Sequence, residues 1–434
     1  MKRFLSLLRA SVWFVAALAP SYGSAATGAV LSPVEATLWQ ADLRHMADEV
    51  TRWHKQAFHT VSRAEFDASI ATLDAKIPSI SRHQVIVEMA RIVATIGDGH
   101  TSISPTRDPK IAFRTYPIKL YYFSDGLFIR SATTSFTGLI GGRITAIGDT
   151  PIDMVYAKVR DIIGRDNEMG AQFFAPHLMS MPEVLHALGI IADMNRAAFT
   201  IVQDGKIARV TLGPFGLAKM MCPDTDASWI AEDGWVDART ANNTSAFWLG
   251  DPLNKFRLEY LADKQAIYAQ INEIGNKTDE TVEAFSRRLL EFVDRHDAEK
   301  LVVDLRLNRG GNGKLNRYLI SSIIKARKLD QPRKLFVLIG RSTFSAAQFL
   351  VNDLEWLTNA TFVGEPSGSK SNIYGDSRRI VLPNSGITVR VSTLWWQVDE
   401  RDQRQWTSPH VQALLTFDDY KNNRDPALQT ALDY

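Results

Sequence analysis

Short apolar runs alternate with amphipathic segments between residues 266 and 366, and this alternation constrains the fold more than any other feature. The apolar runs have the length of buried strands and cover 266–274, 300–307, 334–340 and 360–366. The segments between them carry apolar residues three or four positions apart, which predicts helices over 280–296, 313–327 and 345–357. Strands joined by helices form right-handed crossovers. The sequence therefore predicts an α/β domain with a mostly parallel sheet.

The rest of the chain follows two other patterns. Residues 33–97 show helical spacing in three segments, with Ser62 and Ser81 as expected N-caps. From about residue 116 the apolar residues alternate, with hairpin turns expected at Asp125-Gly126 and Asp204-Gly205. Helices are expected near 153–163 and 181–192. The predicted fold class is therefore multi-domain α+β, with a helical N-terminal region, a β-rich module and the C-terminal α/β domain.

The first 25 residues have the pattern of a secretory signal peptide. Three basic residues precede a short apolar stretch, and Gly23 and Ala25 are the small residues before a cleavage site near Ala25. An apolar run of about ten residues is too short to span a bilayer, which takes about twenty. We expect an exported protein, periplasmic or secreted, with no membrane span after cleavage.

Charge and cysteine content exclude several classes of protein. Fifty Lys and Arg against 48 Asp and Glu leave a formal charge of +2, with no basic stripe of the kind that binds nucleic acid. Cys222 is the single cysteine, so the chain has no internal disulfide and depends on its cores for stability. Cys222 lies between an apolar run and a loop, and we do not expect it to be catalytic.

Three polar loops follow strands of the predicted parallel sheet, at 308–313, 341–345 and 365–372. Loops that leave the carboxyl ends of parallel strands meet at one edge, where ligands bind. Ser345 would begin a helix directly after a strand, so its hydroxyl could face a substrate beside unpaired amides. The alternative is that Ser345, or Ser342, only caps the helix.

The loop 308–313 adds the means of stabilising an oxyanion. Gly310 and Gly311 allow the backbone to approach a ligand closely, and an amide of one of them could act together with the amide of Ala346. A phosphate-binding loop does not fit, because Asn308 and Leu315 occupy positions that require Gly and Ser or Thr.

Two residues could serve as the base for a serine nucleophile. Lys370 lies among small residues and could act as a base if burial lowered its pKa, whereas a solvated lysine could not. His100 titrates near neutrality, but it could also be a structural histidine. The histidines form no recognisable ligand set, so no metal is expected, and no organic cofactor is implied.

Taken together, the motifs resemble those of the tail-specific, or C-terminal processing, serine peptidases of family S41 and their tricorn-like relatives. The resemblance rests on LVVDLRLNRGGNG at 301–313, STFSAAQ at 342–348, FVGEPSGSK at 362–370 and DGHTS at 98–102, with RDPALQTAL at 424–432. It implies a PDZ-like module over 116–215, from which the stretch 165–197 departs as an insertion. It also implies a protein or peptide substrate.

The resemblance assigns roles to individual residues. In the processing-peptidase branch the nucleophile corresponds to Ser345 and the base to the lysine 25 residues later, Lys370. In the tricorn-like branch the base corresponds to His100, oriented by an acid that we would look for among Asp399, Glu400 and Asp402. Asp304 and Arg306 are expected to brace their loop.

The sequence thus predicts an exported serine endopeptidase in which Ser345 attacks, Lys370 acts as the base, and amides of Gly310 or Gly311 with Ala346 hold the oxyanion. The alternatives are a Ser345–His100 peptidase and a catalytically silent peptide-binding homologue. An α/β-hydrolase esterase fits less well, because Gly-x-Ser-x-Gly is absent at Ser345. The predicted division is a signal peptide at 1–25, a helical region at 26–115, the PDZ-like module at 116–215 and the peptidase domain at 216–434.

Overall fold

The computed structural model describes residues 28–218, 229, 232–239 and 246–434. The predicted signal peptide and Cys222 lie outside these ranges. Within them, no helix combines the length and the apolar character needed to cross a membrane.

The N-terminal region contains the three predicted helices: α1 (Pro33–Trp53), α2 (Arg63–Lys76) and α3 (Arg82–Ala94). Each begins at a serine whose backbone N–H donates to the side chain three residues later. Ser62 donates to Glu65 over 2.9 Å, and Ser81 donates to Gln84 over 3.0 Å. The predicted N-caps are confirmed, and such caps stabilise a helix by about 1 kcal/mol each.

The β-rich module is an antiparallel sheet in the order β2-β3-β4-β6-β7. These strands are β2 (Ile118–Phe123), β3 (Gly126–Thr133), β4 (Arg143–Ile147), β6 (Ala197–Gln203) and β7 (Lys206–Leu212), with β5 (Thr150–Pro151) beside β4 and β9 (Trp235–Asp237) beside β3. The turn at Asp204-Gly205 is confirmed. The first turn lies one residue earlier than predicted, at 124–125, because Gly126 pairs with Phe123.

Three helices pack with this sheet: α4 (Ile152–Arg160), α5 (Glu168–Met179) and α6 (Pro182–Ala187). The last two occupy the stretch 165–197 that departs from the PDZ-like pattern. A single hydrophobic core contains residues of α1, α3, β3, β6 and α6, so the helical region and the β-rich module pack as one body. Two short strands, β1 (Arg114–Thr115) and β8 (Gly216–Leu217), pair at its margin.

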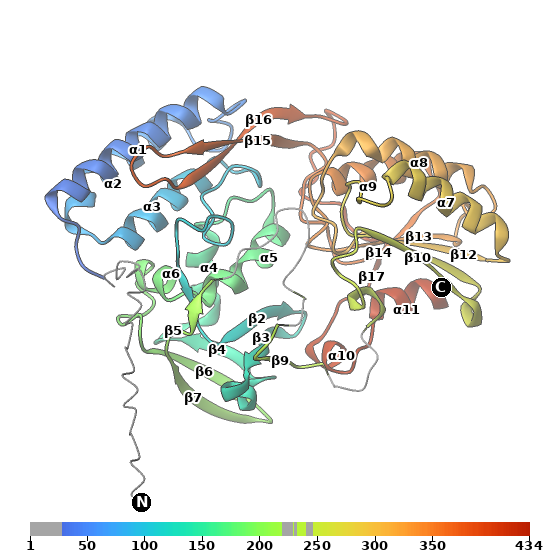
Figure 1. The fold of residues 1–434 in the computed structure, drawn as a ribbon, viewed down its shortest axis with the longest axis horizontal. Helices are drawn as coiled ribbons and strands as arrows, with labels where there is room; N and C mark the ends of the chain where they lie inside the picture. Colours follow the sequence, from blue (N-terminus) through green and yellow to red (C-terminus); the bar gives the residue numbers. More distant parts are fainter. Residues whose placement is uncertain (1–27, 219–228, 230–231, 240–245) are drawn as a thin grey trace, which may run out of the picture.

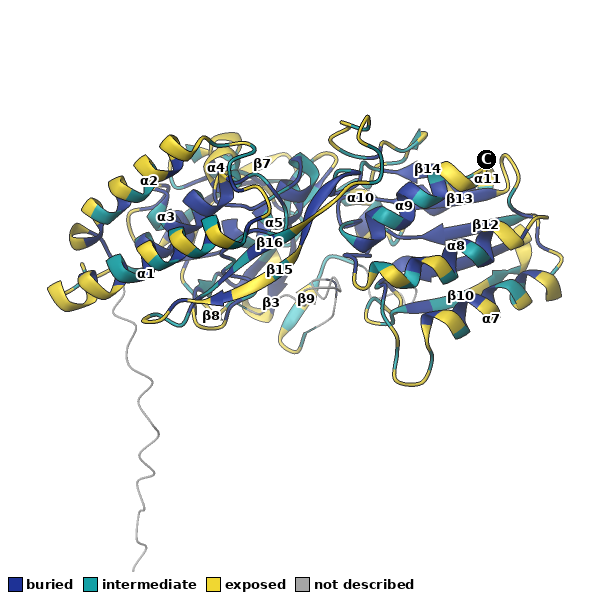
Figure 2. Cartoon of the chain, turned by 90° about the horizontal axis from the view of Figure 1, so that it is seen from above, coloured by how far each residue is buried: buried dark blue, intermediate teal, exposed yellow. Residues whose placement is uncertain are grey.

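The C-terminal region contains the predicted mostly parallel sheet, in the order β10-β11-β12-β13-β14-β17. Its strands are β10 (Phe256–Leu261), β11 (Ala266–Ile271), β12 (Lys300–Asp304), β13 (Leu335–Ile339), β14 (Thr361–Gly364) and β17 (Val411–Gln412), and only β10 is antiparallel. Helices α7 (Val282–Arg295), α8 (Asn316–Lys325) and α9 (Ala346–Leu357) cover one face, and α11 (Pro426–Asp433) packs on the other. The central strands β11 to β14 are almost wholly buried, β10 is mostly half-buried, and the outer faces of α7 and α8 are exposed (Figure 2). The predicted fold class is confirmed.

A long hairpin joins the two bodies. Strands β15 (Ile373–Val381) and β16 (Thr388–Trp396) leave the C-terminal sheet and extend to the N-terminal helices (Figure 1). Ile380, Val389 and Val391 are buried in the N-terminal core, although they lie in the sequence of the predicted peptidase domain. The chain returns to the C-terminal sheet and adds α10 (Phe417–Lys421) before α11.

A contact between two histidines, the buried His83 of α3 and the half-buried His186 of α6, gives a prediction about acid stability. His83 Nε2 lies 2.8 Å from His186 Nδ1, and burial, reinforced by His186, Arg114 and Arg82, lowers the pKa of His83 from 6.5 to about 4. Because protonation is easier in the unfolded chain, the contribution of His83 to stability is present above pH 6.5 and is lost as the pH falls toward 4. The full effect is up to about 3 kcal/mol.

We expect His83→Asn to reduce the loss of stability between pH 6.5 and pH 4, measured by urea unfolding. The matched control is His45→Asn, in α1 and outside this contact. Equal pH dependence in wild type and His83→Asn would contradict the assignment.

Candidate active site

The three polar loops meet at the carboxyl edge of the parallel sheet, as predicted. The Phe344 N–H donates to the Asn308 carbonyl over 3.1 Å, and the Gly368 N–H donates to the Thr343 carbonyl over 3.0 Å. These bonds join the loop after β12 to the loop after β13, and the latter to the loop after β14. Residues far apart in the sequence therefore share one small region.

Ser345 lies on a strained turn between β13 and α9. Its φ is +59° and its ψ is −123°, a backbone conformation that costs a non-glycine residue on the order of 1–3 kcal/mol. Ser345 is the N-cap residue of α9, but its side chain makes no capping hydrogen bond. Instead, Ser345 Oγ lies 2.9 Å from His100 Nε2. The hydroxyl thus faces the imidazole of His100.

His100 is held by contacts from three parts of the chain. Its backbone N–H donates to Asp98 Oδ1 over 2.8 Å, and its carbonyl accepts a hydrogen bond of 2.7 Å from Ser377 Oγ of the hairpin. Its ring stacks on Phe344, the residue before the serine, with centroids 4.6 Å apart. The imidazole is therefore oriented by packing and by its own backbone.

Asp98 organises the loop that carries His100. Besides the His100 amide, Asp98 Oδ1 accepts the Thr101 N–H over 2.7 Å and the Ser392 hydroxyl over 2.8 Å. Asp98 Oδ2 lies 2.8 Å from His54 Nε2. Because the Gln56 N–H donates to His54 Nδ1, the proton of His54 is on Nε2 and is donated to Asp98.

The environment of His100 keeps its imidazole neutral. Burial is the largest cause and lowers its pKa from 6.5 to about 4, opposed by Asp98 and Asp376 and assisted by Arg107 and Arg309. His100 Nδ1 is buried and has no hydrogen-bond partner among the described residues. A neutral ring whose Nε2 faces a hydroxyl is the form that can accept a proton at neutral pH.

The candidate oxyanion donors separate into two groups. The Gly310 N–H donates to Asn308 Oδ1 over 2.9 Å, so it is already engaged and does not fit the predicted role. Gly311 and Ala346 both line the cleft beside Ser345, and their N–H groups have no acceptor within the described ranges. These two amides are the pair available to an oxyanion.

Gly310 instead allows the loop to approach the serine. It has a φ of +111°, and a Cβ on it would lie 2.8 Å from Ser345 Cβ and 3.0 Å from the Ala346 nitrogen. Any larger residue would push against the turn that presents the hydroxyl.

Lys370 is not hydrogen-bonded to Ser345. In the described part of the chain no hydrogen bond joins the two residues, and Lys370 is absent from the lining of the cleft. The nearer contact comes from its neighbour Ser369, whose Oγ accepts the Ser345 N–H over 3.4 Å. The geometry therefore favours the His100 alternative over the preferred Lys370 prediction.

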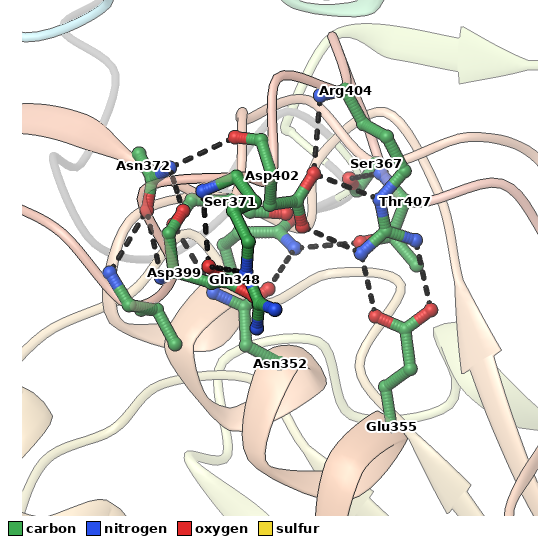
Figure 3. A network of polar contacts seen from close by, with 12 residues as sticks. Gln348, Asn352, Glu355, Ser367, Ser371, Asn372, Asp399, Asp402, Arg404 and Thr407 are labelled. Atoms are coloured by element: carbon green, nitrogen blue, oxygen red, sulfur yellow. Dashed lines mark hydrogen bonds and ion pairs between the residues drawn. The ribbon is translucent and has the colours of Figure 1, made fainter.

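The acidic loop at 398–403 does not supply an orienting acid either. Asp402 pairs with Arg404 at 2.7 Å, and Arg404 also pairs with Glu355 at 2.7 Å (Figure 3). Asp399 pairs with Arg401, and Glu400 is exposed. Arginines of the same segment thus hold two of these carboxylates, and the acids that act on His100 are Asp98 and Asp376.

Sequence reasoning missed several residues of the site. Asp98 could have been found, because an aspartate two residues before a turn amide commonly accepts that amide's hydrogen bond. No sequence pattern marks Phe344 or Ser377, because each contacts His100 only once the chain has folded.

The cleft has a volume of about 770 Å³. The hairpin forms one wall, where Trp396 packs near Phe349 with ring centroids 5.7 Å apart. The charged residues of its lining, histidine aside, are mainly basic: Arg107, Arg309, Lys314 and Arg390, against Glu273 and Asp376. In the described ranges, no group of three His, Cys, Asp or Glu side chains is placed to hold a metal ion.

Comparison with solved structures places this geometry in a known fold. Mature CPAF matches with a TM-score of 0.60 and 12% identity, over 92% of this chain and 96% of that one. CPAF complexed with lactacystin matches with a TM-score of 0.59 and 12% identity, over 92% and 97%. A serine-to-alanine mutant of CPAF matches at 0.58 and 13%, over 92% and 96%. No protein-family profile and no curated protein sequence matches the chain.

The close approach of Gly310 gives a prediction about the turn. We expect Gly310→Ala to lower kcat by roughly 100-fold, because a displacement of about 1 Å at a reacting group costs that much. The measurement is steady-state hydrolysis of a substrate that the wild type cleaves. Gly138→Ala is the matched control, since a Cβ there meets nothing within 4 Å. Equal activity of the two variants would show that the approach is unimportant.

Proposed function

We propose that this chain is an exported serine endopeptidase of the S41 type, with Ser345 as nucleophile and His100 as general base. The observation that carries the proposal is the 2.9 Å separation of His100 Nε2 and Ser345 Oγ on a strained strand-to-helix turn. The fold shared with CPAF and the ordered motifs support the same class.

The geometry suggests an acyl-enzyme mechanism. Ser345 Oγ attacks the peptide carbonyl carbon while His100 Nε2 takes the hydroxyl proton. The tetrahedral intermediate collapses as His100 returns that proton to the leaving amine, which breaks the C–N bond. Water then attacks the ester, again with His100 as the base, and releases the acid and free Ser345.

The amides of Gly311 and Ala346 are the proposed oxyanion donors. Both line the cleft on the side of the nucleophile. Ala346 begins α9 and Gly311 lies in the loop after β12. Backbone amides fixed in place stabilise developing negative charge without reorganising, and one such donor contributes roughly 3 kcal/mol to the stabilisation of the transition state.

An unfolded polypeptide is the proposed substrate. A cleft of about 770 Å³ bounded by a hairpin has room for several residues of an extended chain. Export is proposed from the N-terminal charge and hydropathy pattern.

The test is cleavage of an unstructured protein by the mature chain and three single variants. We expect Ser345→Ala to abolish cleavage and His100→Ala to reduce kcat by 10²–10⁴-fold, as loss of a general base does. Lys370→Ala should keep most of the activity at pH 8, because Lys370 makes no hydrogen bond with Ser345. The readout is fragment formation over time with matched, folded proteins.

Two outcomes would change the assignment. If Lys370→Ala is inactive and His100→Ala is not, the serine–lysine mechanism replaces the one proposed. If folded wild type cleaves nothing in a panel that includes acidic peptides, the chain is a peptide-binding homologue.

A further inference from the structure

Asp166 is a buried carboxylate that lies between the two catalytic loops. It follows α4, in the segment that departs from the PDZ-like pattern, and it is 6% exposed. Asp166 Oδ1 accepts the Gly99 N–H over 2.7 Å, and Asp166 Oδ2 accepts the Ser369 hydroxyl over 2.7 Å. Ser369 Oγ in turn accepts the Ser345 N–H over 3.4 Å.

These three hydrogen bonds form a chain from one catalytic residue to the other. Gly99 is the residue before His100, and the last acceptor in the chain takes the backbone N–H of Ser345. Gly99 is also tightly packed, since a Cβ on it would lie 2.7 Å from the Phe344 ring and 3.1 Å from Asp166 Oδ1. A shift of Asp166 would therefore move the histidine loop and the serine loop relative to each other.

The backbone on either side of Asp166 is fixed independently. Asn167 Nδ2 donates to the Ser367 carbonyl over 3.1 Å and to the Gln405 carbonyl over 2.8 Å. On the other side, Gly164 packs so closely that a Cβ would lie 2.2 Å from the Thr101 carbonyl oxygen. Asp166 is thus held in a fixed position, from which it bonds to the loop of His100 and, through Ser369, to the loop of Ser345.

We propose that Asp166 is a positioning residue whose ionised carboxylate sets the separation of His100 and Ser345. The proposal rests on the proposed function of that pair. An ionised carboxylate only accepts hydrogen bonds, and here it receives one donor from each loop. Protonation on Oδ1 would remove the acceptor of the Gly99 N–H, and protonation on Oδ2 would reverse the hydrogen bond to Ser369, so that its hydroxyl no longer donates to Asp166.

Asp166 changes its charge in a pH range where the activity of the protein can be measured. Burial raises its pKa from 3.8 to about 6, opposed by the Ser369 hydroxyl and the Gly99 amide. Two charged groups act on it: Asp98 raises the pKa, and Lys370 lowers it. Lys370 therefore favours the ionised form of Asp166, which gives this lysine a role without a hydrogen bond to the nucleophile.

The test compares the pH dependence of kcat in wild type and Asp166→Asn. Wild type should lose activity as the pH falls through about 6, although His100, with a pKa of about 4, is still neutral there. Asp166→Asn should lower kcat at pH 8 by about 10–100-fold, as loss of an orienting contact does, with KM changed less than about threefold. It should also lose the acid limb near pH 6. A merely structural carboxylate would not set that limb.

Two further variants keep the proposal falsifiable if Asp166→Asn folds poorly by circular dichroism. Ser369→Ala removes the link to Ser345 and should lower kcat about tenfold at pH 8. Lys370→Met should move the acid limb to higher pH. The proposal is overturned if Asp166→Asn keeps wild-type kcat and its acid limb, or if Ser369→Ala and Lys370→Met both behave as wild type. If wild type itself neither cleaves substrate nor reacts at Ser345, the proposed function fails, and this proposal with it.

Discussion

The hydrogen-bond contact between His100 Nε2 and Ser345 Oγ brings together residues of two separately packed bodies, and many other contacts between those bodies keep it aligned. His100 extends from the N-terminal core, whereas Ser345 lies at the edge of the parallel sheet. The hairpin β15–β16 starts beside the parallel sheet and packs into the N-terminal core, so it contacts both bodies. Ser102 and Arg390 exchange backbone hydrogen bonds of 3.0 and 2.9 Å, and Ser377 holds the His100 carbonyl. The alignment is therefore built from long-range contacts.

Buried ion pairs also hold the loops that follow β12, β13 and β14 at the edge of the parallel sheet. Arg306 pairs with Asp304 at 2.6 Å and with Asp425 at 2.7 Å, which matches the bracing role expected for that loop. Arg341, four residues before Ser345, pairs with Glu365 at 2.7 Å and donates to the Tyr122 carbonyl of β2 over 2.9 Å. Removing one member of such a pair leaves a buried charge uncompensated, which costs about 3–5 kcal/mol.

The sequence predicted those features that depend on local pattern. The strand–helix alternation between 266 and 366 gave the sheet, its helices and the three loops, because buried strands and amphipathic helices have distinct periods. Ser345, His100, Gly311 and Ala346 were all identified as candidates. The sequence left Gly310 and Gly311 as alternative donors, since nothing in NRGGNG indicates that the Asn308 side chain accepts the Gly310 N–H.

The choice of base could not be made from the sequence. His100 is 245 positions from Ser345, and Lys370 is 25 positions away with the spacing of a known motif, so local reasoning favours the lysine. Whether either reaches the hydroxyl depends on Phe344, Asp98 and the hairpin, which come together only in the folded chain. Asp166 escaped notice for the same reason, because its partners Gly99 and Ser369 are 67 and 203 positions away.

The most direct test of a serine activated by His100 is the rate at which a fluorophosphonate labels Ser345, followed by mass spectrometry of the modified peptide. This measurement needs no knowledge of the substrate. We expect labelling of wild type at Ser345, at least 100-fold slower labelling of His100→Gln, and a change of less than about threefold in Lys370→Met. Fast labelling of His100→Gln together with loss of labelling in Lys370→Met would contradict the account.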